Sequence, residues 1–154
     1  MHDRDDRRSN YAAALLMEKI VRDTYSMRGS GEIQPLQWSI LRYLQTFPKQ
    51  GCTVSKISGF LGVTHAPVVR AVNTLVRRGL VTQTCNPEDS RSKLLCLTPK
   101  GIDKMKDDPI LRVVRYMESQ PAREREQFKK FVRALVLRTG MSEHGDDGGD
   151  TSDR

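Results

Sequence analysis

Cysteine is scarce in this chain of 154 residues, and its three copies follow no pattern typical of a metal site or a disulfide framework. Cys52, Cys85 and Cys96 are odd in number, and no C-x-x-C pair occurs. The three histidines are scattered in the same way. Structural zinc needs thiolate and imidazole ligands at short, regular spacings, and a disulfide framework needs paired cysteines. We therefore expect no metal, and no motif indicates a cofactor.

Segments that would direct the chain to a membrane are also lacking. No apolar run approaches the roughly 20 residues that cross a bilayer. The first ten residues, "MHDRDDRRSN", are mostly charged and have no apolar core, unlike a secretory signal. We expect a cytoplasmic protein with no membrane partner.

Catalytic signatures are absent as well. The sequence shows no nucleophile beside a base, no paired carboxylates, no phosphate-binding loop and no metal motif. We therefore do not expect an enzyme.

Positive charge is abundant and unevenly distributed. The net charge is +7 and the isoelectric point about 9.6. Residues 140–154 hold five acidic residues and one arginine, so the remainder of the chain is more basic still. This imbalance suits a polyanionic partner such as nucleic acid, although basic charge also serves solubility alone. Hydrophobic residues make up only 37%, which favours a partner subunit that covers apolar surface.

The central sequence reads as a series of short helices. We expect disorder over residues 1–9 and in the acidic tail 140–154, with one domain over residues 10–139 between them. Apolar residues recur at helical spacing from Asn10, and a helix start at Pro35 follows. Thr53 and Thr64 are placed to cap two further helices, which the glycines of "LGVT" and "RRGL" end.

The period then changes to that of strands. "LVTQTC" and "KLLCLT" are β-rich runs separated by the turn-forming "NPEDSRS". Thr98 and Pro99 start another helix, which Asp108 and Pro109 should kink or restart. A final amphipathic helix follows "ESQP". The order predicts a mainly α fold with a small β-hairpin, that is, a winged helix-turn-helix over about residues 34–101 with helices at both ends.

These fragments resemble the MarR family of bacterial transcription regulators. The resemblance rests on "QWSIL", "TVSKISGFLGVTHAPVVRAVNTLVRRGLV" and "PEDSRSKLLCLTPKG", including the D-x-R pair Asp89 and Arg91 and the T-x-x-G of Thr98 and Gly101. It implies a homodimer built by helices at about residues 10–27 and 99–139. It also implies a regulator, such as a repressor that a small molecule releases from DNA. A winged-helix module that binds protein is the alternative.

The second helix of a helix-turn-helix places its N-terminal part in the major groove. We expect groove contacts from six residues: Thr64, His65, Ala66, Pro67, Val69 and Arg70. Arg70 can form a bidentate contact with guanine, whereas a solvated helix face is the plainer alternative. Polar residues are usual in the family where Ala66 and Pro67 stand, so reading of DNA shape is a further possibility. Backbone phosphates should meet Ser55, Lys56, Arg77, Ser92 and Lys93.

The hairpin should lie over the neighbouring minor groove. Arg91 at its tip would enter the groove, and the Asp89 carboxylate would hold the Arg91 guanidinium in an ion pair that fixes its direction. The expected operator is pseudo-palindromic double-stranded DNA, bound by both subunits of the dimer.

Two forms of control are open from the sequence. Relatives commonly bind a small molecule between the dimerisation helices and the winged helix, where Tyr11, Trp38 and Tyr43 are candidates to line a pocket. For Trp38 a core position is the favoured alternative. Redox sensing through Cys52, Cys85 or Cys96 is the second form, but small buried thiols are commoner and hairpin register should not place Cys85 opposite Cys96.

Overall fold

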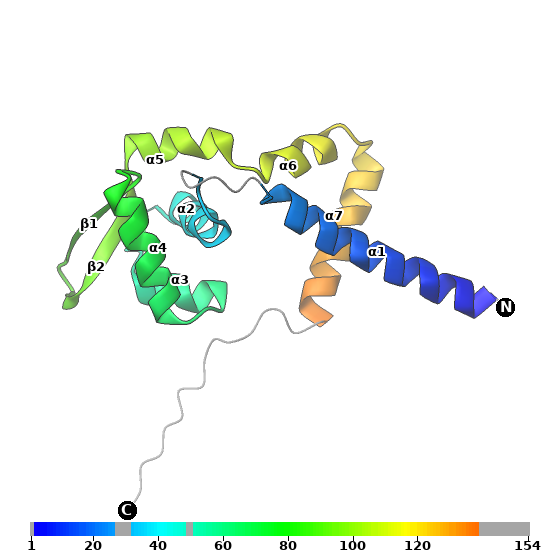
Figure 1. Cartoon of the computed structure of the whole chain (residues 1–154), viewed down its shortest axis with the longest axis horizontal. Helices are drawn as coiled ribbons and strands as arrows, with labels where there is room; N and C mark the ends of the chain where they lie inside the picture. The colour runs from blue at the N-terminus through cyan, green and yellow to red at the C-terminus, as the bar shows by residue number, and fades with distance from the viewer. Residues whose placement is uncertain (1, 27–31, 49–50, 139–154) are drawn as a thin grey trace, which may run out of the picture.

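The computed structural model describes residues 2–26, 32–48 and 51–138 (Figure 1). Ten elements follow one another along these ranges: α1 (His2–Thr24), α2 (Pro35–Thr46), α3 (Val54–Leu61), α4 (His65–Arg77), β1 (Val81–Asn86), β2 (Asp89–Leu97), α5 (Pro99–Lys104), the 3₁₀ helix η1 (Met105–Asp107), α6 (Leu111–Glu118) and α7 (Ala122–Arg138). The expected mainly helical fold with one hairpin is confirmed. None of the helices within these ranges combines the length and hydropathy that a bilayer span requires.

The expected start of α1 at Asn10 is wrong. The helix begins at His2, within the stretch expected to be disordered. Residues 2–24 contain neither glycine nor proline, so nothing in the backbone opposes helix. The acidic tail 140–154 lies outside the described residues.

The winged helix has one apolar core. Side chains of α2, α3, α4 and the hairpin fill it, and those with no exposed area include Ile40, Leu41, Ile57, Val68 and Leu75. On α4 the buried positions fall at 68, 71, 72 and 75, a spacing of three and four that puts them on one helix face. The opposite face of α4 is consequently left at the surface.

The turn of the helix-turn-helix forms as its residues dictate. Thr53 caps α3 by accepting a hydrogen bond from the Lys56 backbone N–H at 3.3 Å. Gly62 ends α3 with φ of 62°, a left-handed conformation that costs a glycine little. Thr64 stands at the N-cap position of α4, but its side chain makes no capping hydrogen bond.

The hairpin is longer and its turn shorter than expected. Only Pro87 and Glu88 separate the strands, and the residues placed in the turn at 89–92 belong to β2. Cys85 pairs with Lys93 and Asn86 with Asp89, so the three residues 90–92 have no opposite partner. A β-bulge therefore occupies the position at which the sequence suggested a loose tip. Pro, Asp and Ser are typical of turns, but Asp89 and Ser92 belong to β2, where the bulge lies.

The junction of hairpin and α5 explains the T-x-x-G pattern. The Thr98 hydroxyl accepts a hydrogen bond from the Gly101 N–H at 2.9 Å, which caps α5. It also donates to the Gly79 carbonyl at 2.7 Å. A Cβ on Gly101 would lie 2.1 Å from the Leu80 carbonyl oxygen. Glycine thus allows α5 to approach the backbone that enters the wing.

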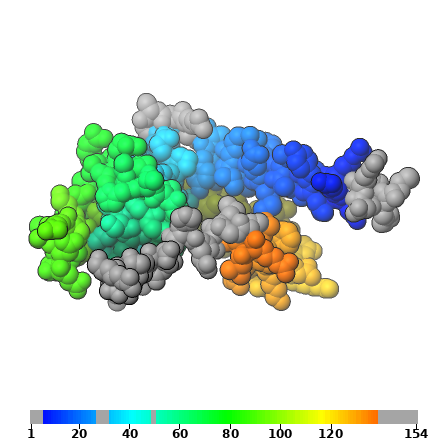
Figure 2. Space-filling model, turned by 90° about the horizontal axis from the view of Figure 1, so that it is seen from below, coloured from blue at the N-terminus to red at the C-terminus, as the bar shows by residue number. Residues whose placement is uncertain are grey.

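Beyond η1 the chain leaves the winged helix. The helical run is interrupted at Asp108 and Pro109, as expected, and resumes with α6. We call α1, α6 and α7 the arm. Figure 2 shows the winged helix at one end of the molecule and α1 with α7 at the other. The arm exposes many large apolar side chains: Tyr11, Leu15, Leu16, Met17, Ile20, Val21, Val114, Tyr116, Phe128, Phe131, Val136 and Leu137.

Candidate nucleic-acid interface

The outward side of α4 presents a compact set of side chains. Successive residues of a helix turn by about 100°, so positions 66, 69, 70, 73 and 77 share one side. We call Ala66, Val69, Arg70, Asn73 and Arg77 the α4 face. Four of them are exposed and Val69 is half-buried. The face is neutral or basic throughout, as contact with DNA requires.

Arg70 and Asn73 hold the middle of the α4 face. Arg70, Asn73 and Arg77 line one surface hollow, and the Arg77 guanidinium donates to the Thr74 hydroxyl at 3.2 Å. Sequence reasoning missed Asn73, because it stopped at the first turns of the helix. The helical period could have identified it, since Asn73 stands three residues after Arg70.

The first turn of α4 holds the remaining expected residues. His65 and Ala66 are exposed, and Pro67 is half-buried. Because Thr64 is exposed and its hydroxyl does not cap the helix, that hydroxyl is available to an external acceptor. The groups meet at one end of α4, which matches the expected arrangement.

The wing tip is organised differently from the expectation. No ion pair joins Asp89 to the Arg91 guanidinium; instead the Asp89 carboxylate accepts a hydrogen bond from the Arg91 backbone N–H at 3.0 Å. A short aspartate side chain readily accepts a backbone N–H two residues on, and the Asp89 carboxylate is used in this way. Arg91 is therefore fixed through its backbone, and its side chain is exposed.

Two further side chains stabilise the bulge. The Asn86 amide donates to the Ser92 hydroxyl at 2.8 Å, and its carbonyl oxygen accepts from the Glu88 N–H at 3.1 Å. Ser92, expected at a phosphate, donates its hydroxyl to the Asp89 carbonyl at 3.2 Å. Asn86 escaped notice in the sequence as an ordinary turn residue. Lys93, by contrast, is exposed at the edge of the wing and donates to Gln83 at 3.4 Å.

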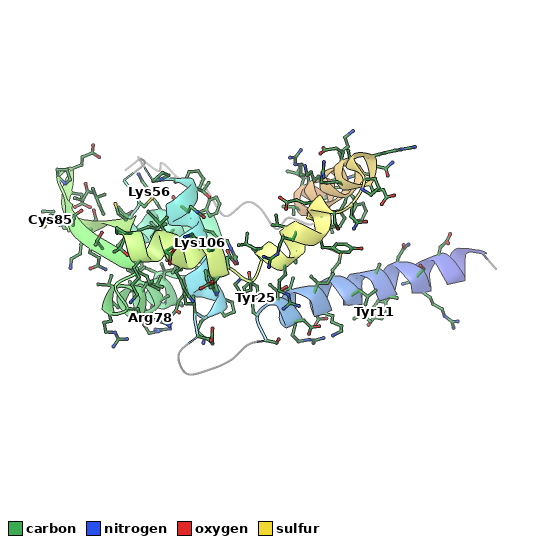
Figure 3. All side chains as sticks on the ribbon, turned by 90° about the horizontal axis from the view of Figure 1, so that it is seen from above. Tyr11, Tyr25, Lys56, Arg78, Cys85 and Lys106 are labelled. Carbon is green, nitrogen blue, oxygen red and sulfur yellow. The ribbon has the colours of Figure 1, made fainter. Side chains whose placement is uncertain are left out.

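A hollow of about 780 Å³ separates the wing from the start of α3. Ser55 and Lys56 line one side of it, and Glu88 and Asp89 line the other. Figure 3 shows Lys56 on α3, beside the strand end that carries Cys85. The expected phosphate contacts from α3 and the wing thus face a common space.

The cysteines lie apart in chemistry and direction. Cys52 is buried and donates its thiol to the Phe47 carbonyl at 3.1 Å. Burial, and to a lesser extent the nearby Cys96, raises the pKa of Cys52. Cys85 and Cys96 are exposed and free. They pair with Lys93 and Thr82, so they lie on opposite faces of the hairpin and cannot bond to each other in this fold. The expected lack of register is confirmed.

The three aromatic residues proposed for a pocket do not share one environment. Trp38 and Tyr43 are core residues of α2, and the Tyr43 ring contacts those of Phe47 and Phe60 at tilted or edge-on angles, with ring centroids 4.9 Å away in each case. Tyr11 is 68% exposed. Figure 3 places it far along α1, away from the winged helix. No group of His, Cys, Asp and Glu suited to a metal occurs in the described ranges.

Comparison with known proteins identifies this architecture. Residues 32–92 match the family model described as MarR family. Over these residues the chain is similar to the MarR family, in agreement with the winged helix described above. The match spans α2 to the middle of β2 and thus includes the α4 face and the wing tip.

Solved structures share the fold over most of the chain. A mutant of MepR from S. aureus bound to an oligodeoxyribonucleotide is 20% identical with a TM-score of 0.58, over 85% of this chain and 97% of that one. PcaV from Streptomyces coelicolor with its natural ligand is 21% identical with a TM-score of 0.61, over 82% and 91%. A further MarR family transcription regulator is 22% identical with a TM-score of 0.70, over 90% and 93%. At these identities the likeness concerns the fold. None of the curated proteins compared matches the chain.

Proposed function

We propose that this protein is a dimeric, sequence-specific DNA-binding regulator of transcription. The observation that carries the proposal is the basic α4 face, which stands exposed beside a hairpin whose tip holds Arg91. Both features belong to a MarR-family winged helix. The DNA-bound MepR structure supports the choice of ligand, because its fold is the same.

The α4 face fits the major groove. Arg70 can contact guanine O6 and N7, and Asn73 can contact adenine N6 and N7, each pair contributing roughly 1–3 kcal/mol of discrimination. Ala66 and Val69 can contact thymine methyl groups. Thr64, just before the face, and Arg77, at its far end, suit phosphates that fix the register.

The wing fits the adjacent minor groove. The bulge aims the Arg91 side chain outward, and an arginine gains most where the groove is narrow and its potential strongly negative. Ser55, Lys56 and Lys93 then meet the backbone on either side of the hollow. Glu88 and Asp89 would repel phosphates, so the backbone should pass closer to the α3 side.

A second copy of the chain is the proposed cover for the arm. The apolar residues of α1 and α7 are exposed in one subunit, and such faces are normally buried against a partner. A two-fold dimer would set two α4 helices about one helical turn apart on a pseudo-palindromic operator. The PcaV structure, which holds its natural ligand, supports a small-molecule effector. The proposal adds that this chain is a repressor and that the effector releases it from DNA.

Fluorescence anisotropy over a series of salt concentrations tests the DNA contacts. We expect Arg70→Ala to lower the affinity for a selected operator by about tenfold or more and to relax base preference. Arg91→Ala should weaken binding, most of all on operators with a narrow minor groove. Lys106→Ala is the matched control, because it removes an exposed positive charge from η1, outside both surfaces.

Equal affinity of the wild type, Arg70→Ala and Arg91→Ala would contradict the proposed docking. Binding that does not change with salt would instead favour the winged-helix module that binds protein.

A further inference from the structure

A single arginine joins three segments that are distant in sequence. Arg42 on α2 donates from Nε and Nη2 to the two carboxylate oxygens of Asp108, at 2.6 Å each. The same Nη2 donates to the Tyr25 hydroxyl at 2.8 Å. We call Arg42, Asp108 and Tyr25 the clamp. Its members lie in the winged helix, just before α6, and just after α1.

Asp108 fixes the start of α6. Its side chain is 3% exposed, and besides Arg42 it accepts the Ile110 N–H at 3.0 Å. Pro109 follows it and favours the extended backbone that Asp108 adopts, with ψ of 121°. The chain thus turns sharply at this point, and the Arg42 fork ties the turn to α2.

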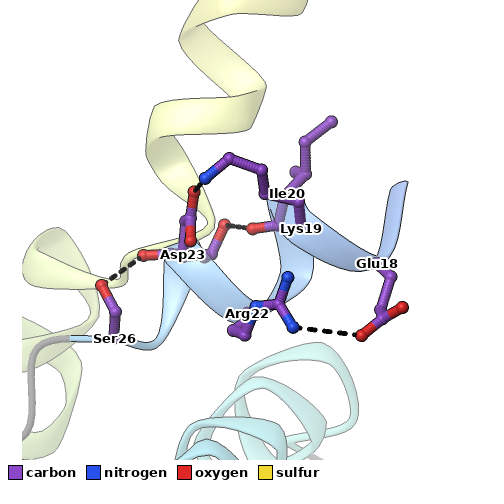
Figure 4. A network of polar contacts seen from close by, with 7 residues as sticks. Glu18, Lys19, Ile20, Arg22, Asp23 and Ser26 are labelled. Carbon is purple, nitrogen blue, oxygen red and sulfur yellow. Dashed lines mark hydrogen bonds and ion pairs between the residues drawn. The ribbon is translucent and has the colours of Figure 1, made fainter. Parts of the chain in front are cut away.

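Tyr25 fixes the end of α1 in the same way. The Arg42 guanidinium lies 5.7 Å from the centre of the Tyr25 ring, so it contacts both the ring and the hydroxyl. Just before Tyr25, the buried Thr24 donates to the Ile20 carbonyl at 2.6 Å, and Ser26 donates to Asp23. Figure 4 shows this orderly helix end, and Figure 3 places Tyr25 where α1 approaches the α5–α6 connection.

Side-chain packing alone does not fill the junction. Close backbone approaches between the arm and the winged-helix elements are few. A cavity of about 510 Å³ lies beside the clamp, lined in part by Arg42, Asp108 and Ile110. Burial alone would lower the pKa of Arg42, but the hydrogen bonds to Asp108 and Tyr25 outweigh it and the pKa is raised overall. The guanidinium therefore remains charged. The planar Arg42 guanidinium binds both Asp108 carboxylate oxygens in a fixed geometry, whereas a loosely packed apolar contact allows many orientations.

We propose that the Arg42–Asp108–Tyr25 clamp is a positioning device that sets the angle between the winged helix and the arm. Both connections to the arm are held by one α2 side chain, so α1 and α6 cannot move independently of each other. This inference rests on the proposed dimeric DNA binding in one respect. In a dimer joined through the arms, the clamp angle determines the separation of the two α4 helices and hence the operator spacing that fits.

A distance measurement without DNA tests the clamp directly. Cys96→Ser leaves Cys85 as the exposed label site on the wing, and Arg8→Cys adds a second site on α1. Spin-labelled protein is diluted with unlabelled protein so that the intrachain distance dominates. We expect one narrow distribution in this parent and a clearly broader one when Arg42→Ala is added. An unchanged distribution in a folded Arg42→Ala protein would overturn the proposal.

Weaker variants guard against simple misfolding. Tyr25→Phe removes only the hydroxyl, and Arg42→Lys keeps the charge without the fork. We expect both to keep the wild-type circular dichroism spectrum and to broaden the distribution less than Arg42→Ala. Asp103→Asn is the matched control: Asp103, on the neighbouring α5, forms an exposed ion pair with Lys106 of η1, and its loss should change nothing. Broadening in Asp103→Asn equal to that in Arg42→Ala would also refute the clamp.

The consequence for DNA is read from operators whose spacer gains or loses base pairs. The wild type should lose about tenfold in affinity when the spacing is wrong, and Arg42→Ala about threefold or less. A merely destabilised protein would lose affinity equally on every spacer. If the wild type binds no DNA while the distances respond as expected, the regulatory function fails and the clamp stands.

Discussion

At the residue scale, spacing in the sequence predicted where the candidate groups lie, but not their hydrogen-bond partners. The helical period put Arg70 on an outward face, and D-x-R placed Arg91 in the wing. The Asp89 carboxylate, however, binds the Arg91 backbone N–H and not its guanidinium. This hydrogen bond depends on the bulge in β2, and no local sequence pattern predicts the position of that bulge. For the same reason the contact between Arg42 and Asp108, 66 residues apart, was beyond sequence reasoning.

Asp89 offers a test that separates the two kinds of contact. Asp89→Asn keeps an oxygen that can accept the Arg91 N–H, while Asp89→Ala does not. We expect Asp89→Asn to bind operator DNA about as well as the wild type, or better, because a negative charge is removed. Asp89→Ala should bind several-fold more weakly, with about 1 kcal/mol or less lost in the free energy of unfolding. Anisotropy and urea denaturation give both quantities. Equal losses in the two variants would restore the ion-pair hypothesis.

Gly101 is the residue whose replacement should cost most for its size. A methyl group there would meet the Leu80 carbonyl oxygen, and a backbone oxygen cannot move aside as a flexible side chain can. We expect Gly101→Ala to lower the free energy of unfolding by about 1–3 kcal/mol, despite the usual preference of helices for alanine. Thermal denaturation followed by circular dichroism measures it. Gly59→Ala, on α3 where a Cβ meets nothing within 4 Å, is the control and should be neutral or stabilising.

Cys52 carries a prediction about pH. Burial raises its pKa, so the folded state holds the thiol proton more tightly than the unfolded chain does. The resulting contribution to stability is complete below the unfolded pKa of about 8.5 and is lost as the pH rises through the folded value. We expect Cys52→Ala to reduce the fall in unfolding free energy between neutral and alkaline pH, measured by urea denaturation. In the wild type, alkylation should modify Cys85 and Cys96 well before Cys52. Reaction of Cys52 at the same rate would contradict its burial.

At the element scale, periodicity and capping residues predicted the main helices and both strands, whereas η1 was not predicted and α6 was expected only as a kink or restart. The other errors fell at the ends of elements. The turn of the hairpin contracted from "NPEDSRS" to Pro87 and Glu88, because pairing of Asn86 with Asp89 extended both strands. Helix α1 lengthened to His2, since charged residues without glycine or proline propagate a helix once it has formed. Composition had suggested disorder there, but composition describes the average of a segment and not its neighbours. Capping residues predicted helix starts more accurately than composition did. Thr53 and Thr98 form the expected capping hydrogen bonds, although Thr64 does not.

At the scale of the whole molecule, the division into winged helix and arm followed from the sequence, but their relative orientation did not. The orientation depends on the clamp and on surfaces that the single chain leaves open. The strongest of these is the apolar side of α1, where Leu16 and Ile20 are 59% and 52% exposed. Single exposed apolar residues are common on soluble proteins, whereas a run at helical spacing with a second run on α7 is not.

The last prediction concerns this surface. Leu16→Glu places a charge in the proposed interface and should shift the protein toward monomers, because an unpaired carboxylate is costly to bury. Light scattering after size exclusion measures the mass. The melting temperature of the wild type should rise with concentration, while that of the variant should not. Thr82→Glu, exposed on β1 away from the arm, is the control.

If Leu16→Glu remained dimeric, the arm would have to pair through α7 without α1. If the wild type were itself a monomer with a concentration-independent melting temperature, the two-fold geometry on which operator spacing depends would be lost. Binding of a single half-site through the α4 face and Arg91 would then be the function left to measure.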